Sequence, residues 1–181
     1  MMNKVYLGID IGGTAAKFGL VDENGNILHK DEFSVSFDGY ETPILKTVLE
    51  KTEYFVASSG LAFTEISGIG VSATGQIDSE KGEVIGSAGH IKNWVGSKIK
   101  ESFEKKYFVK TIVINDANSA ALGEKWIGAG RGYKNIVAIT IGTGVGGGII
   151  VDDKILLGKR GLAGEIGHIV IHGSGESCSC G

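Results

Sequence analysis

Two glycine-rich segments carry the residue types that a phosphate-binding site requires. The first is Asp10-Ile11-Gly12-Gly13-Thr14, with Lys17 three residues further on. Glycines let backbone N–H groups approach anionic oxygens without a Cβ in the way, and the Thr14 hydroxyl adds another donor. Asp10 could hold Mg²⁺ through water near the phosphates, and Lys17 could add a positive charge. An isolated segment of this kind is also compatible with an ordinary glycine turn.

The second segment, Gly142-Thr143-Gly144-Val145-Gly146-Gly147-Gly148, offers the same chemistry more strongly. It lacks the Lys-Ser/Thr end of a Walker loop and opens a strand rather than a helix, so it is neither a P-loop nor a Rossmann turn. Two such hairpins facing each other can hold a nucleoside triphosphate from both sides. The pair therefore predicts a nucleotide phosphate site, with Gly142, Thr143 and Gly144 in its second half.

Asn115-Asp116 stands where a predicted strand ends and a predicted helix begins. A carboxylate in that place can project into a cleft and accept the proton of an attacking hydroxyl. The same position also suits the N-cap of the helix, a role that strongly favours Asp or Asn. Both roles stay open on the residues alone.

A metal site is indicated near the C-terminus. His168, Cys178 and Cys180 supply three of the four ligands expected at a closed tetrahedral zinc site. The fourth is missing, because the sequence stops at Gly181, and a Cys-x-Cys pair at a terminus can also be incidental. Glu165 is a poor zinc ligand, but it lies close enough to hydrogen-bond to a ligand beside the metal.

Apolar runs and periodic segments predict the elements that must position these residues. Strands are expected at 5–11, 15–21, 27–35, 66–72, 110–114, 135–141 and in the segment that ends at Val151, and helices at 44–55, 97–106 and 117–126. Ser97 is expected to cap the second of these helices. Strands and helices alternate after an opening three-strand meander, which predicts an α/β protein.

An internal repeat links the two glycine-rich segments. A shift of 130 positions superposes Ile9, Ile11, Gly12, Val21 and Asp22 on Ile139, Ile141, Gly142, Val151 and Asp152. In both copies a buried strand reaches a glycine turn, comes back and ends in an acidic turn. We therefore predict an N-terminal domain at 1–116, with the first hairpin and the candidate base Asp116, and the first part of a C-terminal domain at 117–181, with the second hairpin and the incomplete zinc motif.

The composition restricts the class of protein. The chain has 181 residues, 42% of them hydrophobic, with a formal net charge of −3 and no basic field for nucleic acid. Its 30 glycines lie in or between β-branched runs, which indicates tight turns and close approach of backbone to a ligand. The apolar stretches are strand-length, and the start lacks the apolar run of a signal peptide. We expect a cytoplasmic protein without nucleic-acid or membrane partners.

These segments resemble the motifs of the ROK family of bacterial sugar kinases, in the actin-like ATPase superfamily with its ribonuclease H-like fold. The similarity covers the whole chain. Its four motifs, in the family's order, are residues 10–17, residues 115–118 with 120–124, residues 141–148, and residues 161–168 with 178–181.

The resemblance implies transfer of the γ-phosphoryl group of ATP to the 6-hydroxyl of a hexose or N-acetylhexosamine, with glucose or N-acetylmannosamine favoured. Asp116 would be the general base, which it can be while it caps the helix, and Mg²⁺ would accompany the phosphates. Gly75, Asn115, Glu165 and His168 would bind sugar, and Zn²⁺ would fix His168 and its loop. A homodimer is expected on the same basis.

The chain departs from the family pattern in its sugar loop. The family usually places an Asn four residues before the Trp of that loop, whereas here His90 holds that position and Asn93 directly precedes Trp94. We consider both His90 and Asn93 candidate sugar contacts, and the sequence does not identify the preferred sugar.

The sequence ends inside the zinc motif. The family's third Cys, its following sugar-binding Glu and the adenine-binding part of the second domain have no counterpart up to Gly181. We therefore expect an inactive fragment of a kinase as one alternative. A sugar-responsive repressor is the other, although repressors of the family carry an N-terminal helix-turn-helix module and here the first strand is expected at Val5.

Overall fold

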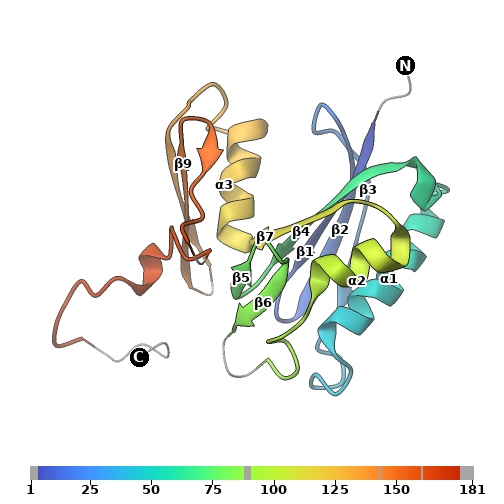
Figure 1. Cartoon of the computed structure of the whole chain (residues 1–181), viewed down its shortest axis with the longest axis horizontal. Helices are drawn as coiled ribbons and strands as arrows, with labels where there is room; N and C mark the ends of the chain where they lie inside the picture. The colour runs from blue at the N-terminus through green and yellow to red at the C-terminus, as the bar shows by residue number, and fades with distance from the viewer. Residues whose placement is uncertain (1–3, 88–90, 143, 160, 176–181) are drawn as a thin grey trace. The chain divides into compact units, whose positions relative to one another are not determined.

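A computed structural model describes residues 4–87, 91–142, 144–159 and 161–175. The chain forms two compact units, Met1–Asp116 and Ala117–Gly181, which are described separately (Figure 1). Within the described ranges, no helix is long and apolar enough to cross a membrane.

The first unit is built on a mixed five-stranded sheet (Figure 1). Its strands are β1 (Val5–Ile11), β2 (Ala15–Asp22), β3 (Ile27–Ser34), β4 (Ile66–Ala73) and β7 (Thr111–Asn115), in the order β3-β2-β1-β4-β7. The first three strands form the expected antiparallel meander, and β4 and β7 are parallel to β1. A small hairpin, β5 (Gln76–Asp78) and β6 (Glu83–Gly86), follows β4.

Two helices pack on the sheet and enclose the core of this unit. They are α1 (Ile44–Ser58) and α2 (Ile99–Tyr107), and a short 3₁₀ turn (Phe63–Glu65) precedes β4. Alternate residues of a strand face the same side of a sheet, and the buried set of β1 is Leu7, Ile9 and Ile11. These side chains join one cluster with Ile44, Val48, Phe55, Ile99 and Phe103 of the helices.

The predicted N-cap of α2 is wrong. Lys98, not Ser97, holds the N-cap position, and its side chain makes no capping hydrogen bond. The Ser97 carbonyl instead accepts from the Val84 N–H at 3.1 Å, so this residue belongs to the bridge between β6 and the loop.

The second unit contains α3 (Asp116–Trp126) from Ala117 onward, β8 (Ile136–Ile141), β9 (Val145–Val151), β10 (Lys154–Ile155) and the 3₁₀ turn η2 (Ile166–His168). Its strands form an antiparallel sheet in the order β10-β9-β8. The α/β class expected from the sequence is therefore confirmed in the element order of the whole chain.

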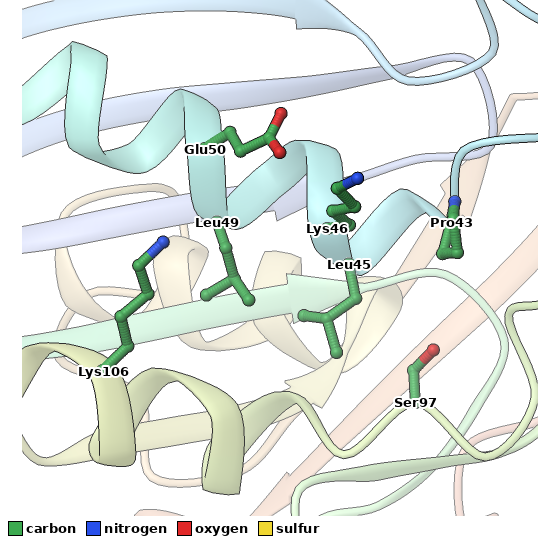
Figure 2. Close-up of a pocket in the computed structure, with 7 residues that line it drawn as sticks. All are labelled: Pro43, Leu45, Lys46, Leu49, Glu50, Ser97 and Lys106. Atoms are coloured by element: carbon green, nitrogen blue, oxygen red, sulfur yellow. The ribbon is translucent and has the colours of Figure 1, made fainter.

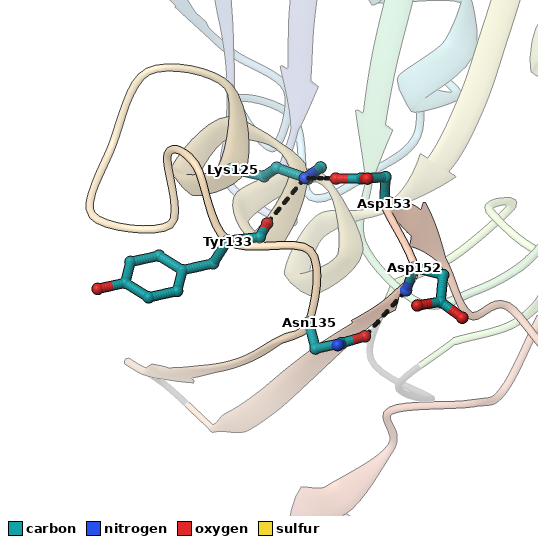
Figure 3. Close-up of polar contacts among 5 residues, drawn as sticks. All are labelled: Lys125, Tyr133, Asn135, Asp152 and Asp153. Atoms are coloured by element: carbon teal, nitrogen blue, oxygen red, sulfur yellow. Dashed lines mark hydrogen bonds and ion pairs between the residues drawn. The ribbon is translucent and has the colours of Figure 1, made fainter.

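Polar contacts fasten the loops of the second unit to α3 (Figure 3). The Lys125 ammonium donates to the Tyr133 carbonyl at 2.9 Å and to the Asp153 carboxylate at 2.5 Å. The Asp152 N–H donates to Asn135 Oδ1 at 2.9 Å. The end of α3, the loop before β8 and the β9–β10 turn are thus held together.

The predicted repeat is present as two hairpins, but their registers differ by one residue. Ile11 pairs with Ala16 across four residues, whereas Ile141 pairs with Val145 across three. The outgoing strands therefore superpose with a shift of 130 and the returning strands with a shift of 129. The predicted equivalence of Val21 with Val151 and of Asp22 with Asp152 is wrong, because the second turn is one residue shorter.

The Asp22 carboxylate organises the β2–β3 turn. It accepts from Asn26 Nδ2 at 2.8 Å and from the N–H groups of Asn24 and Asn26 at 2.9 Å each. These bonds hold the pKa of Asp22 below its usual value, and the side-chain bond from Asn26 has the largest effect.

We therefore expect Asp22→Asn to lower stability in a pH-dependent way. A depressed folded-state pKa contributes stability above the unfolded-state pKa, and this contribution is lost as pH falls through the folded-state pKa. The variant should unfold at lower urea concentration than wild type at about pH 7, and the difference should shrink towards about pH 3. An equal difference at both pH values would contradict this origin, and Asp31→Asn on the exposed strand β3 provides the control.

Candidate active site

The carboxyl ends of three parallel strands meet at one edge of the five-stranded sheet. Ile11, Ala73 and Asn115 lie side by side in register at the ends of β1, β4 and β7. The segments that leave these ends are the first glycine-rich hairpin, Thr74-Gly75 and Asp116. In open α/β sheets, ligands bind outside the carboxyl ends of the strands. The fold thus gathers three of the sequence-predicted segments of the first unit at such an edge.

In the first hairpin, the backbone N–H groups of Gly13 and Thr14 are the ones that can take an anion. The Gly12 N–H donates to the Ala15 carbonyl at 3.0 Å, so it is used inside the hairpin. The Gly13 and Thr14 N–H groups make no hydrogen bond among the described residues, and the Thr14 side chain is exposed. Successive N–H groups of this kind suit an anionic oxygen.

Asp10 and Lys17 lie on the face of the sheet opposite the buried side chains of β1. They are cross-strand neighbours, and both side chains are exposed. On its other side Asp10 pairs with Ser72 of β4, whose hydroxyl donates to Asp10 Oδ1 at 2.7 Å. Ser72 was not predicted from the sequence, because the register of two parallel strands far apart in the chain leaves no local signal.

The Gly75 turn is held from two directions. The Asn115 side chain donates from Nδ2 to the Gly75 carbonyl at 3.0 Å, and the buried Trp94 donates from Nε1 to the Thr74 carbonyl at 2.9 Å. Gly75 has a φ of 98°, and a Cβ there would lie 2.5 Å from the Gly86 carbonyl oxygen. Both positions that the sequence proposed as sugar contacts here, Gly75 and Asn115, are therefore joined by a hydrogen bond.

The loop around Trp94 includes Asn93, another of the predicted sugar contacts. Asn93 is exposed with a φ of 57°, and its Nδ2 donates to the Tyr40 carbonyl at 3.5 Å. His90 lies outside the described residues.

Asp116 is exposed and is the first residue of α3, so Asn115 occupies the position before the helix. A carboxylate in the first turn interacts favourably with the positive end of the helix dipole.

The glycine run of the second hairpin has two different tasks. The turn itself is closed by the Gly142 N–H, which donates to the Gly144 carbonyl at 2.9 Å, and a Cβ at either residue would meet open space. Thr143 lies outside the described residues. Gly142 and Gly144 are thus placed where a ligand can approach.

The remaining glycines of the run lie in β9 and permit close packing. A Cβ at Gly146 would lie 2.9 Å from that of Ala117, and one at Gly148 would lie 2.5 Å from that of Ala121, both on α3. A Cβ at Gly147 would lie 2.5 Å from the Gly164 carbonyl oxygen. These three residues therefore serve packing rather than phosphate binding.

Glu165 and His168 come together at the 3₁₀ turn η2, where His168 Nε2 lies 3.7 Å from Glu165 Oε2. Cys178 and Cys180 lie outside the described residues. Within the described ranges, no group of three His, Cys, Asp or Glu side chains could hold a metal ion. His168 alone does not make a zinc site, so zinc stays a prediction from the sequence.

A hollow of about 380 Å³ lies between α1 and the segment that leads into and through α2 (Figure 2). It is lined by Pro43, Leu45, Lys46, Leu49, Glu50, Ser97 and Lys106. None of the predicted phosphate, sugar or metal residues is among them, so this hollow is not the candidate active site.

The strand order and the segments at the carboxyl edge define an α/β domain of a ligand-binding type. The model of the ROK family matches residues 6–181, and the chain therefore belongs to the ROK family. A glucokinase of Thermotoga maritima is 35% identical over 175 residues, which cover 97% of this chain and 53% of that protein.

Solved structures agree with this assignment. A ROK family glucokinase from Streptomyces griseus, in complex with glucose and AMPPNP, superposes with a TM-score of 0.81 at 34% identity over 98% of this chain and 54% of that chain. A ROK family transcriptional regulator, a homologue of the E. coli MLC protein, superposes with a TM-score of 0.86 at 27% identity over 99% of this chain and 45% of that chain. The predicted actin-like fold is confirmed, and the chain spans about half the length of the curated relatives it matches.

Gly75→Ala tests the Gly75 turn. The new methyl group would meet the Gly86 carbonyl, and the φ of 98° is unfavourable for alanine. We expect the free energy of unfolding to fall by about 2 kcal/mol or more. Gly70→Ala is the control, because a Cβ there meets open space, and it should change stability by less than about 0.5 kcal/mol. Equal effects in urea unfolding would contradict the proposed constraint.

Proposed function

We propose that this chain contributes the phosphate and sugar sites of an ATP-dependent sugar kinase. The observation that carries the proposal is the shared edge of β1, β4 and β7, where the first glycine hairpin, Gly75 and Asn115-Asp116 leave adjacent strand ends. Similarity to glucokinases supports the substrate class. The reaction would transfer the γ-phosphoryl group of ATP to the 6-hydroxyl of a hexose or N-acetylhexosamine, of which glucose and N-acetylmannosamine are the first to test.

Asp116 would act as the general base that accepts the proton of the sugar hydroxyl as attack on the phosphorus begins. Its exposed position at the start of α3 supports this role. Asn115, Glu165 and His168 would bind sugar hydroxyls. Correct placement of the attacking oxygen would supply a large part of the rate enhancement in a reaction of this type.

The N–H groups of Gly13 and Thr14 would bind phosphate oxygens, and Lys17 would add a positive charge. The turn at Gly142 and Gly144 would provide a second set of donors. Asp10, held by Ser72, is a suitable carboxylate for a water-coordinated Mg²⁺, which when bound would neutralise phosphate charge.

Sugar binding without turnover is the second candidate function. It is favoured by the high structural similarity to a ROK family transcriptional regulator. A coupled ADP-release assay with glucose and N-acetylmannosamine, combined with sugar binding by calorimetry, separates the two. Sugar binding without ADP release would contradict kinase activity of this chain and support the second candidate.

For Asp116→Asn, we expect kcat to fall at least about a hundredfold while sugar binding stays detectable, because the amide cannot accept the hydroxyl proton. Steady-state kinetics and calorimetry measure the two quantities. The control Asp152→Asn removes a charge from an exposed turn of the second unit and should leave kcat unchanged. Turnover retained by Asp116→Asn would assign the base to another residue.

For zinc, elemental analysis of the purified chain gives the direct test. If His168, Cys178 and Cys180 are ligands, bound zinc should be present and should be lost in the double variant Cys178→Ser, Cys180→Ser. Zinc that persists in the double variant would place the metal elsewhere, and its absence from wild type would make the Cys-x-Cys pair incidental.

A further inference from the structure

We propose that Tyr40 is a positioning residue for phosphate binding, because its hydroxyl sets the orientation of the Gly13–Thr14 peptide. The inference rests on the proposed function of the first hairpin. Tyr40 lies in the loop between β3 and α1, which carries no residue of the predicted site.

The contact is a single hydrogen bond to the backbone of the hairpin. The Tyr40 hydroxyl donates to the Gly13 carbonyl at 2.9 Å, and its half-buried ring packs against the core of the first unit. In a trans peptide the carbonyl and the following N–H point in opposite directions. Holding the Gly13 carbonyl towards Tyr40 therefore turns the Thr14 N–H away from Tyr40, where a phosphate oxygen can meet it.

The next carbonyl of the hairpin is held in the same manner. The Thr14 carbonyl accepts from the Val35 N–H at 2.9 Å, with the hydroxyls of Ser34 and Ser36 at 3.5 and 3.4 Å. Both carbonyl oxygens are thus engaged by the segment from Ser34 to Tyr40. An anion would be repelled by carbonyl oxygens that turned towards it, so these bonds keep the donors, rather than the acceptors, available.

The backbone of Tyr40 is constrained for this contact. Its φ is 66°, in the left-handed region that residues with a Cβ seldom adopt, and it follows Gly39 with a φ of 68°. Asp38 Oδ2 accepts from the Thr42 N–H at 2.9 Å and closes the loop around them. Such a conformation persists only where the surroundings hold it, and here they direct the ring to the hairpin.

The same residue also contacts the predicted sugar loop. The Tyr40 carbonyl accepts from Asn93 Nδ2, and a Cβ at Gly13 would lie 3.3 Å from Ile91 Cδ1 of that loop. The Gly13 carbonyl is therefore bound by Tyr40, and Ile91 leaves little space for a side chain at Gly13. A displaced Tyr40 would disturb the phosphate donors first, because it bonds to their peptide directly.

Tyr40→Phe removes the hydroxyl alone, and Tyr107→Phe is its matched control. The Tyr107 hydroxyl donates to the Leu49 carbonyl at 2.6 Å, which is the same kind of bond between α2 and α1. Burial raises the pKa of this hydroxyl, so it stays a donor at neutral pH. Both variants should lose stability, whereas only Tyr40→Phe should affect the hairpin.

Two measurements on the full chain decide the proposal. In ¹H–¹⁵N spectra without ligand, we expect Tyr40→Phe, but not Tyr107→Phe, to shift the Thr14 amide resonance. In calorimetry with Mg²⁺–AMPPNP, Tyr40→Phe should raise the dissociation constant about tenfold, against less than about twofold for Tyr107→Phe.

The outcomes separate this inference from the proposed function. Equal dissociation constants of wild type and Tyr40→Phe for Mg²⁺–AMPPNP would overturn the role of Tyr40 but would not contradict the phosphate site. Absence of AMPPNP binding by wild type would contradict the phosphate site, while the amide spectra would still show whether Tyr40 orients the peptide. An unchanged Thr14 resonance in Tyr40→Phe would overturn the orientation argument by itself.

Discussion

The parallel pairing of β1, β4 and β7 is the constraint on which the candidate site depends. Its register brings Ile11, Ala73 and Asn115, which are separated by long stretches of sequence, to one edge of the sheet. The segments that follow these three strands therefore begin at neighbouring strand ends, which are about 5 Å apart from one strand to the next. A one-residue slip of β4 would bury Ser72 and turn Ala73 to the face of Asp10, so register and chemistry are fixed together.

A second constraint acts within the hairpin, where the direction of each peptide decides whether it repels or binds an anion. Glycine permits close approach, but glycine alone does not choose the direction. The choice comes from donors outside the motif, the Val35 N–H and the Tyr40 hydroxyl. In the proposed phosphate site, the motif would supply the donors and the loop from Ser34 to Tyr40 would set their direction.

The sequence predicted strands and helices of the first unit because an apolar run such as that of β1 and a helical period such as that of α1 are local signals. It also indicated which segments carry chemistry. Ser72 and Tyr40 were missed because they act through contacts with residues distant in sequence. The predicted cap at Ser97 was wrong because α2 begins one residue later than expected and Lys98 holds the N-cap position.

The role of each glycine depends on its position in the strand register, which the composition alone does not give. Gly19, Gly8 and Gly70 pair across β2, β1 and β4 and form a row on the face opposite Ile9, away from the β1–β2 turn. With the returning strands superposed by a shift of 129, Gly19 falls on Gly148, which lies against α3 in the second unit. At Gly148 this sheet position allows close packing of α3, whereas a Cβ at Gly70 would meet open space. Part of the glycine content that suggested ligand binding therefore serves packing in β9, and the glycines proposed to bind phosphate are those of the turns at Gly13 and Gly142.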